Sequence, residues 1–132
     1  MADNTSTKFQ VGQVWSYKTR LHETSSTLTV VKIDPGPDGT EDIISIHIAG
    51  LRLLSRNGQH LNHFQHLPIG KSALEESVLE LLQESASLPN HKEGYDTWRK
   101  AFDSGKAGWF TIPVSECLQG VEVITAKQET EE

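Results

Sequence analysis

The sequence has a single cysteine, Cys117, and it lacks any apolar run near the ~18 residues that a membrane-spanning helix needs. One cysteine excludes an intramolecular disulfide, and a lone thiol is typical of proteins in a reducing cytosol. The first eight residues are polar and lack the apolar segment of a secretory signal. We therefore expect a cytoplasmic protein that does not associate with membranes.

Basic residues are also few. Twelve lysines and arginines stand against 18 aspartates and glutamates, which gives a formal net charge of -6. Nucleic-acid binding requires clustered Lys and Arg to neutralise phosphates, so this acidic balance argues against a nucleic-acid partner. It is compatible with a basic protein partner, because complementary charges speed encounter. A net charge of this size also keeps an ordinary domain in solution.

The chain of 132 residues has the length of one ordinary domain, which needs no disulfide or metal to bury a core. Residues 9–126 are predicted to form this domain. Residues 1–8 and the acidic residues 127–132 carry no apolar anchor, so we expect both to be disordered tails.

Strand patterns dominate the first half of the domain, where segments rich in β-branched and aromatic residues alternate with turn residues. Ile44, Ile46 and Ile48 alternate along one such segment and are expected to face the core. Ser45 and His47 lie between them and are expected to face solvent. The predicted strand segments are residues 14–19, 27–33, 43–49, 51–54 and 60–67.

Helical spacing replaces this alternation in the second half. Ser72 and Glu75 fit a capping box at the start of a first helix. A second helix is predicted over residues 94–103, with its aromatic residues on one face, and a third begins near Pro113. The apolar stripe of the first helix is formed by Leu74, Val78, Leu81 and Leu82. That of the third is formed by Val114, Cys117, Leu118 and Val121.

Together these patterns predict an α+β domain. A small antiparallel sheet from the β-rich N-terminal half is packed against three helices from the C-terminal half. Each helix has one apolar stripe to bury, so we expect all three helices on one face of the sheet.

No metal, cofactor or catalytic site is predicted. In a regular strand, His63 points away from His60 and His66, so their spacing closes no tetrahedral metal site. The sequence has no G-x-S-x-G motif. Cys117 lies on a helix stripe expected to be buried, where a thiol is inert.

The candidate binding surface comprises Arg20, His47, His66 and Trp109. Trp109 and Phe110 are neighbours in a short predicted strand, so their side chains point in opposite directions. We expect one of these two aromatic side chains to be partly exposed, and exposed aromatic residues favour contact sites.

Several motifs resemble a family of small, uncharacterised bacterial proteins over the span from Phe9 to Val123. The motifs are Gly12-Gln-Val-Trp-Ser-Tyr-Lys-Thr-Arg20, Ser26-Thr-Leu-Thr29, His66-Leu-Pro68, Gly94-Tyr95, Trp98, Ala101-Phe102 and Gly105-Lys-Ala-Gly-Trp-Phe-Thr111. That family has no established activity. The resemblance therefore implies a bacterial or phage-linked origin and no particular mechanism.

The start of the chain is also similar to the opening of MazF/PemK-type toxin barrels, through Gly12-Gln-Val-Trp-Ser-Tyr17 and Leu28-Thr-Val-Val31. This resemblance implies a small endoribonuclease that would use Arg20 with one of Ser25, Ser26 or Thr27. The sequence departs from the pattern: Gln13 stands where an acidic residue is usual, an Arg-Pro pair is missing, and three predicted helices follow.

Three functions follow from these features. We favour a non-enzymatic protein-binding module of the immunity, inhibitor or adaptor type, because no catalytic group is assembled. The alternatives are a MazF/PemK-like endoribonuclease and a small-ligand or metal sensor that uses the histidines.

Overall fold

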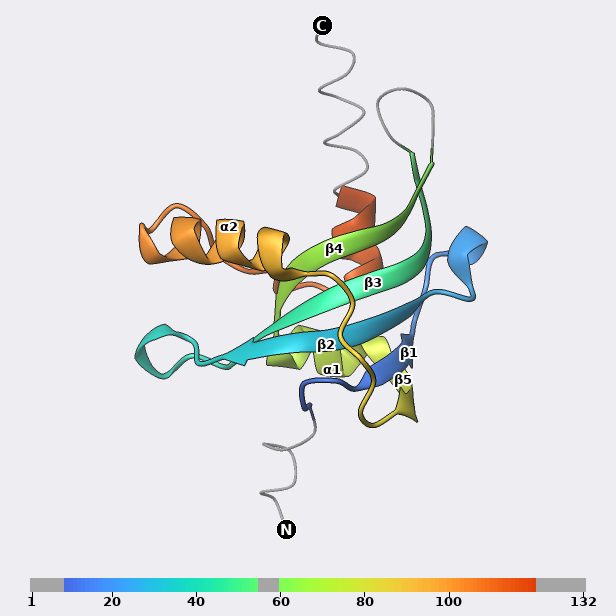
Figure 1. Cartoon of the computed structure of the whole chain (residues 1–132), viewed down its shortest axis with the longest axis horizontal. Helices are drawn as coiled ribbons and strands as arrows, with labels where there is room; N and C mark the ends of the chain where they lie inside the picture. Colours follow the sequence, from blue (N-terminus) through green and yellow to red (C-terminus); the bar gives the residue numbers. More distant parts are fainter. Residues whose placement is uncertain (1–8, 55–59, 121–132) are drawn as a thin grey trace, which may run out of the picture.

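A five-stranded antiparallel sheet forms the body of the computed structural model, which describes residues 9–54 and 60–120 (Figure 1). The strand order is β4-β3-β2-β1-β5, so β4 and β5 are the two edge strands. The predicted tails lie outside the described residues. The strands are β1 (Val14–Tyr17), β2 (Thr27–Asp34), β3 (Ile43–Leu54), β4 (His60–Gly70) and β5 (Val78–Gln83).

Three helices follow or interrupt the strands in the second half of the chain. They are α1 (Lys71–Ser77), α2 (Lys92–Asp103) and a helix over residues 114–120. Two short 3-10 turns, η2 (Leu21–Glu23) and η3 (Pro37–Gly39), connect the first three strands. The α+β class, with strands mostly in the first half and helices in the second, is therefore confirmed.

One face of the sheet carries the apolar core. Ile46 and Ile48 of β3 are fully buried, and Leu74 of α1 and Leu118 of the last helix pack against the same cluster. Cys117 is buried there too, as its place on the apolar stripe predicts. The cluster of buried hydrophobic side chains lies on this face, so this face supplies most of the driving force for folding.

The opposite face of the sheet is covered by α2, so the expectation that all helices share one face is wrong (Figure 1). Because side chains alternate along a strand, Ser45 lies on the face opposite Ile46. It is fully buried there rather than exposed, and it bonds to His66. Tyr95 of α2 donates a hydrogen bond to Asp34 on the same face. Because the helix and the sheet both supply hydrogen-bonding side chains, α2 packs on a sheet face whose polar residues suggest solvent exposure in the sequence.

The first helix is shorter than predicted, because it ends at Ser77 and the chain continues as β5. Ser77 Oγ donates to the carbonyl of Ala73 and accepts from the amide of Val114, so it fixes the end of α1 against the last helix. β5 then pairs antiparallel with β1. Leu81 and Leu82, predicted as part of a buried stripe, are exposed on this edge strand.

The predicted capping box is also wrong. The first turn of α1 is capped from another segment: Glu41 Oε1 accepts the amide of Ser72 at 2.7 Å. Gly70 occupies the N-cap position and has no side chain that could make a capping bond. Gly70 has no Cβ, and this leaves room for the Glu41 carboxylate beside the start of the helix.

Candidate binding cleft between α2 and β4

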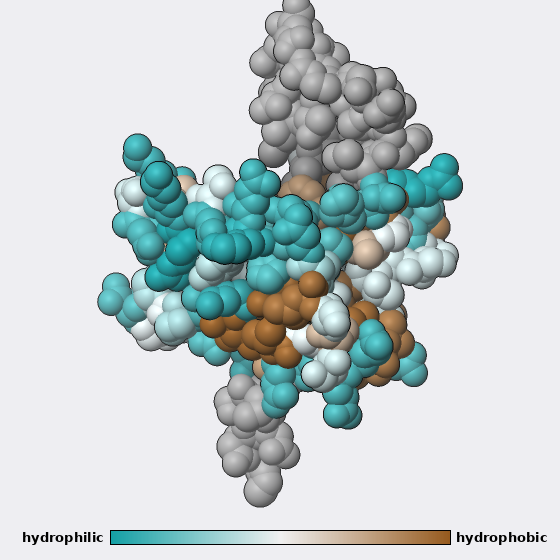
Figure 2. Space-filling model, viewed as in Figure 1, coloured by the Kyte–Doolittle hydropathy of each residue, from teal (hydrophilic) through white to brown (hydrophobic). Residues whose placement is uncertain are grey.

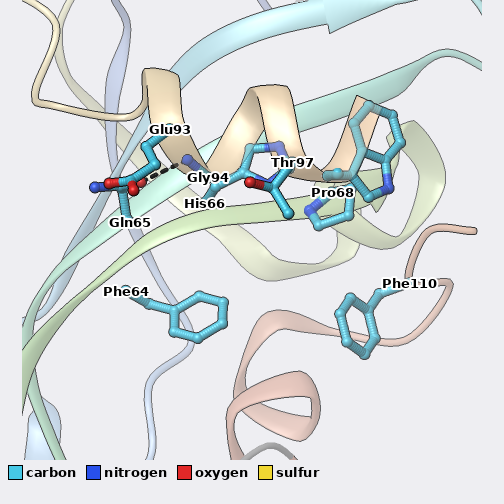
Figure 3. Close-up of a pocket in the computed structure, with 9 residues that line it drawn as sticks. Phe64, Gln65, His66, Pro68, Glu93, Gly94, Thr97 and Phe110 are labelled. Carbon is cyan, nitrogen blue, oxygen red and sulfur yellow. Dashed lines mark hydrogen bonds between the residues drawn. The ribbon is translucent and has the colours of Figure 1, made fainter. Parts of the chain in front are cut away.

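A cleft of about 540 Å³ lies where α2 crosses β4, beside the segment that precedes the last helix (Figure 3). An adjoining cavity of about 430 Å³ shares Pro68, Trp98 and Phe110 with it and adds Trp109. We call the two together the aromatic cleft. The larger part is lined by Phe64, Gln65, His66, Pro68, Glu93, Gly94, Thr97, Trp98 and Phe110.

The first turn of α2 approaches β4 closely because residue 94 is a glycine. The Gly94 amide donates to Gln65 Oε1 at 2.7 Å, shown as the dashed line in Figure 3. A Cβ at this position would lie 2.9 Å from the Cβ of His66, closer than such atoms normally approach. Gly94 therefore sets the spacing between helix and strand, and with it the width of the cleft.

Trp98 forms the inner wall of the aromatic cleft. Its indole nitrogen donates to the carbonyl of Gly108 at 2.7 Å, which ties α2 to the segment that follows it. The ring stacks on Phe102, with centroids 5.0 Å apart, and Phe102 in turn meets Trp109 edge-on at 6.1 Å. These contacts place aromatic rings side by side along one wall.

The opposite wall is fixed to the edge of β4. The Phe110 amide donates to the carbonyl of Pro68 at 2.9 Å, and the Phe110 carbonyl accepts from the amide of Gly70 at 2.8 Å. This is a single parallel bridge rather than the short strand predicted there. Trp109 and Phe110 are both half-buried, so each leaves part of its ring at the surface.

His66 lies in the wall of the cleft as an uncharged group. Its Nε2 is 2.9 Å from Ser45 Oγ, and its ring is 5.6 Å from the rings of both Tyr95 and Trp98. Burial lowers the pKa of His66 to about 4, and the nearby His91 lowers it further while Asp34 opposes the shift. The imidazole is therefore neutral at neutral pH, and it adds apolar rather than charged surface to the cleft.

A bulge in β4 brings more histidines to this face of the sheet. Ile46 pairs with Leu67 and Ile48 with Phe64, so two residues of β4 lie opposite the single residue His47 of β3. His63 consequently shares a face with His66, and the expectation that they point apart is wrong.

His63 stacks on His47, with ring centroids 5.5 Å apart. Burial lowers the pKa of His47, and the electrostatic influence of His63 and His91 lowers it further. Among the residues that the structure describes, no three histidine, cysteine or acidic side chains are arranged to hold a metal ion.

Arg20 lies far from the cleft, in a buried ion pair. Its Nε and Nη2 donate to the two carboxylate oxygens of Glu23 at 2.8 and 2.6 Å. Glu23 also accepts the amide of Arg52, which lies seven residues beyond Ser45 along β3. Burial acts to raise the pKa of Glu23, but the bonds from Arg20 and Arg52 outweigh it and lower the pKa.

The serine suggested by the toxin resemblance is also committed to the fold. Ser26 is buried, and its hydroxyl bonds to Tyr17 Oη at 2.7 Å and to the carbonyl of Ala49 at 2.6 Å. Burial raises the pKa of Tyr17 to about 12, despite the bond to Ser26. Arg20, through Glu23, and Ser26 thus join the segment around η2 to β3.

Of the four residues predicted for a binding surface, the structure brings two together. His66 lines the larger part of the aromatic cleft and Trp109 the smaller part. His47 shares the sheet face with His66 but does not line the cleft, and Arg20 lies apart. The sequence reasoning did not select Phe64, Pro68, Thr97 or Phe110. The aromatic face of the second predicted helix was the signal that could have located this wall.

Comparison with known proteins adds no further information. The chain matches no protein-family model, no curated protein and no solved structure. In the described part of the chain, no helix has the length and apolar character needed to cross a bilayer.

Proposed function

We propose that this chain is a non-catalytic protein-binding module, and that the aromatic cleft receives an apolar side chain of a partner protein. The observation that carries the proposal is the lining of the cleft. Rings of Trp98, Trp109 and Phe110 meet there, and the histidine among them is neutral. Clustered, partly exposed aromatic residues provide much of the binding energy at protein interfaces.

The polar atoms of the cleft support a protein partner over a small ligand. Small-molecule sites use a few converging polar groups to fix the orientation of the ligand. Here Trp98 Nε1, Gln65 Oε1 and His66 Nε2 are bonded to the fold itself, while the polar side chains of Glu93 and Thr97 in the lining are exposed. The surface that remains for a ligand is mostly apolar, which suits an anchoring side chain held in place by contacts elsewhere on the partner.

The proposal also includes a cytoplasmic location and a role as an inhibitor, immunity or adaptor protein. Cys117 is a buried free thiol, and burial raises its pKa to about 12, so it is unreactive. Such a thiol fits a cytoplasmic protein. An inhibitor, immunity or adaptor protein would need only a stable surface of this kind. The ribonuclease alternative gains no support, because the described contacts of Arg20 and Ser26 are structural.

A selection from a random-peptide display library would test the proposal. Peptides selected on the unaltered protein are measured by fluorescence titration against a variant that fills the cleft, Thr97→Trp, and one that removes a wall, Trp109→Ser. We expect both variants to bind at least tenfold more weakly. Leu21→Ser, which removes an apolar side chain that is 95% exposed and lines neither part of the cleft, is the control and should bind normally. Peptides that bind Thr97→Trp as well as the unaltered protein would show that the cleft is not the binding site.

A further inference from the structure

β5 is an edge strand with apolar side chains on its surface. Leu79 is 61%, Leu81 38% and Leu82 49% exposed. Within residues 9–54 and 60–120, β5 pairs with β1 alone, so its other side is unpaired. An edge strand offers unpaired backbone N–H and C=O groups to another chain, and native proteins protect such edges with charged residues, proline or β-bulges. β5 has no lysine or proline, and its only such features are Glu80 and two register shifts against β1, at Leu79 and at Leu82.

Further exposed apolar side chains lie on the segments beside β5. The Ala86 amide donates to the carbonyl of Gly12, which brings the segment after β5 back to the start of β1. Val11 and Leu88, on these two segments, are also exposed. Figure 2 shows apolar surface on the side of the molecule where β1 and β5 lie.

The charges around this edge are predominantly negative. Residues 72–91 contain four glutamates, at positions 75, 76, 80 and 84, and no lysine or arginine. Glu80 and Glu84 are exposed. The nearest basic residue along the paired strand is Lys18, whose amide bonds to the carbonyl of Ser77. The edge therefore combines leucines with a predominantly negative rim.

We infer that β5 accepts an extended segment of another protein by strand addition, and that this segment alternates basic and apolar residues. Main-chain hydrogen bonds supply affinity in such complexes, and alternate side chains supply specificity. The leucines would contact the apolar residues, while Glu80 and Glu84 would attract the basic ones. A second copy of this chain fits less well, because pairing β5 with itself brings the same glutamates together along one ladder. This surface is distinct from the aromatic cleft.

A labelled peptide in which lysine alternates with valine tests the inference on the unaltered protein. We expect fluorescence anisotropy to show binding at least tenfold tighter than for the same peptide with glutamate in place of lysine. Methylating alternate backbone nitrogens of the lysine peptide should abolish binding, since strand addition needs those donors. Equal binding of the lysine and glutamate peptides, or unchanged binding after methylation, would overturn the inference.

Variants then locate the binding site. The exposed-site variants Leu79→Ser with Leu82→Ser, and Glu80→Lys with Glu84→Lys, should each weaken binding at least tenfold, with unchanged circular dichroism. Trp109→Ser, in the aromatic cleft, should bind the peptide normally, so failure here is separable from failure of the proposed function. Sedimentation of the unaltered protein as a dimer that Leu79→Ser dissociates would instead assign the edge to self-association and overturn the inference.

Discussion

The two faces of the sheet are built from different chemistry. The face toward α1 and the last helix is aliphatic, with side chains such as Ile46, Leu74 and Leu118 fully buried. The face toward α2 is polar and aromatic, and its contacts are hydrogen bonds and ring contacts around His66 and Tyr95. The first arrangement maximises buried apolar area. The second holds a helix at a defined distance from the strand and leaves an open cleft beside it.

The largest difference between the faces should appear when a core side chain is truncated. Leu118→Ala removes a fully buried side chain from the aliphatic face, so we expect the free energy of unfolding to fall by about 2–5 kcal/mol. Urea denaturation measures this loss. Leu79→Ala, the same change at an exposed site, should stay within about 0.5 kcal/mol of the unaltered protein. Similar losses for both variants would contradict the assignment of the core to this face.

On the polar face, loss of the hydrogen bond between α2 and β2 should lower the free energy of unfolding by less, and it should affect mainly α2. Tyr95→Phe removes the hydroxyl that donates to Asp34, a buried carboxylate that Arg99 also approaches at 3.5 Å. We expect a loss of about 1.5–2 kcal/mol, because the bond has a charged acceptor. Amide hydrogen exchange should show faster opening of α2 than of β3. Uniformly faster exchange in both elements would show that α2 does not open separately.

A smaller effect should appear as a dependence of stability on pH. The pKa of His66 is lowered to about 4 in the folded protein, from 6.5 in the unfolded chain, so the unfolded state binds more protons between these values. His66 therefore costs the protein no stability above pH 6.5. Below that pH the free energy of unfolding falls as the pH drops toward 4.

We expect this fall to be about 1–2 kcal/mol, after discounting for the partial exposure of the ring. Thermal denaturation of the unaltered protein and of His66→Gln, compared at pH 7 and pH 4.5, isolates the contribution of His66. Glutamine cannot gain a proton, so the variant should lose less stability on acidification. An equal loss in both proteins would assign the pH dependence to other groups.

The sequence predicted the aliphatic face well and the polar face poorly. Ile44, Ile46 and Ile48 alternate regularly, and strand alternation translates directly into burial. Ser45 gives no such signal, because a polar residue is buried only when a partner such as His66 satisfies it. The partner lies on β4, which pairs with β3 through contacts about 20 residues apart in the chain that local sequence patterns do not reveal.

β5 shows a second limit of sequence reasoning. Leu74, Val78, Leu81 and Leu82 have helical spacing, which favours one long helix. However, β2 pairs with only one side of β1. The backbone groups on the other side of β1 find their partners in β5. This long-range pairing overrides the local pattern, as tertiary contacts commonly override propensity. The aromatic cleft depends on the same kind of long-range contact, so its lining could be predicted only in part.

The smallest expected effect separates local from long-range capping of α1. Ser72 and Glu75 have the spacing of a capping box, yet the amide of Ser72 bonds to Glu41, which lies just before β3. Glu41→Ala should therefore destabilise the protein by about 1 kcal/mol, the usual cost of a lost cap. Ser72→Ala keeps the amide and should change the free energy of unfolding by less than about 0.5 kcal/mol. Urea denaturation of the two variants and of the double variant decides between the caps. If Ser72→Ala proves the more costly change, α1 is capped by its own residues, and the loop before β3 does not hold the start of the helix.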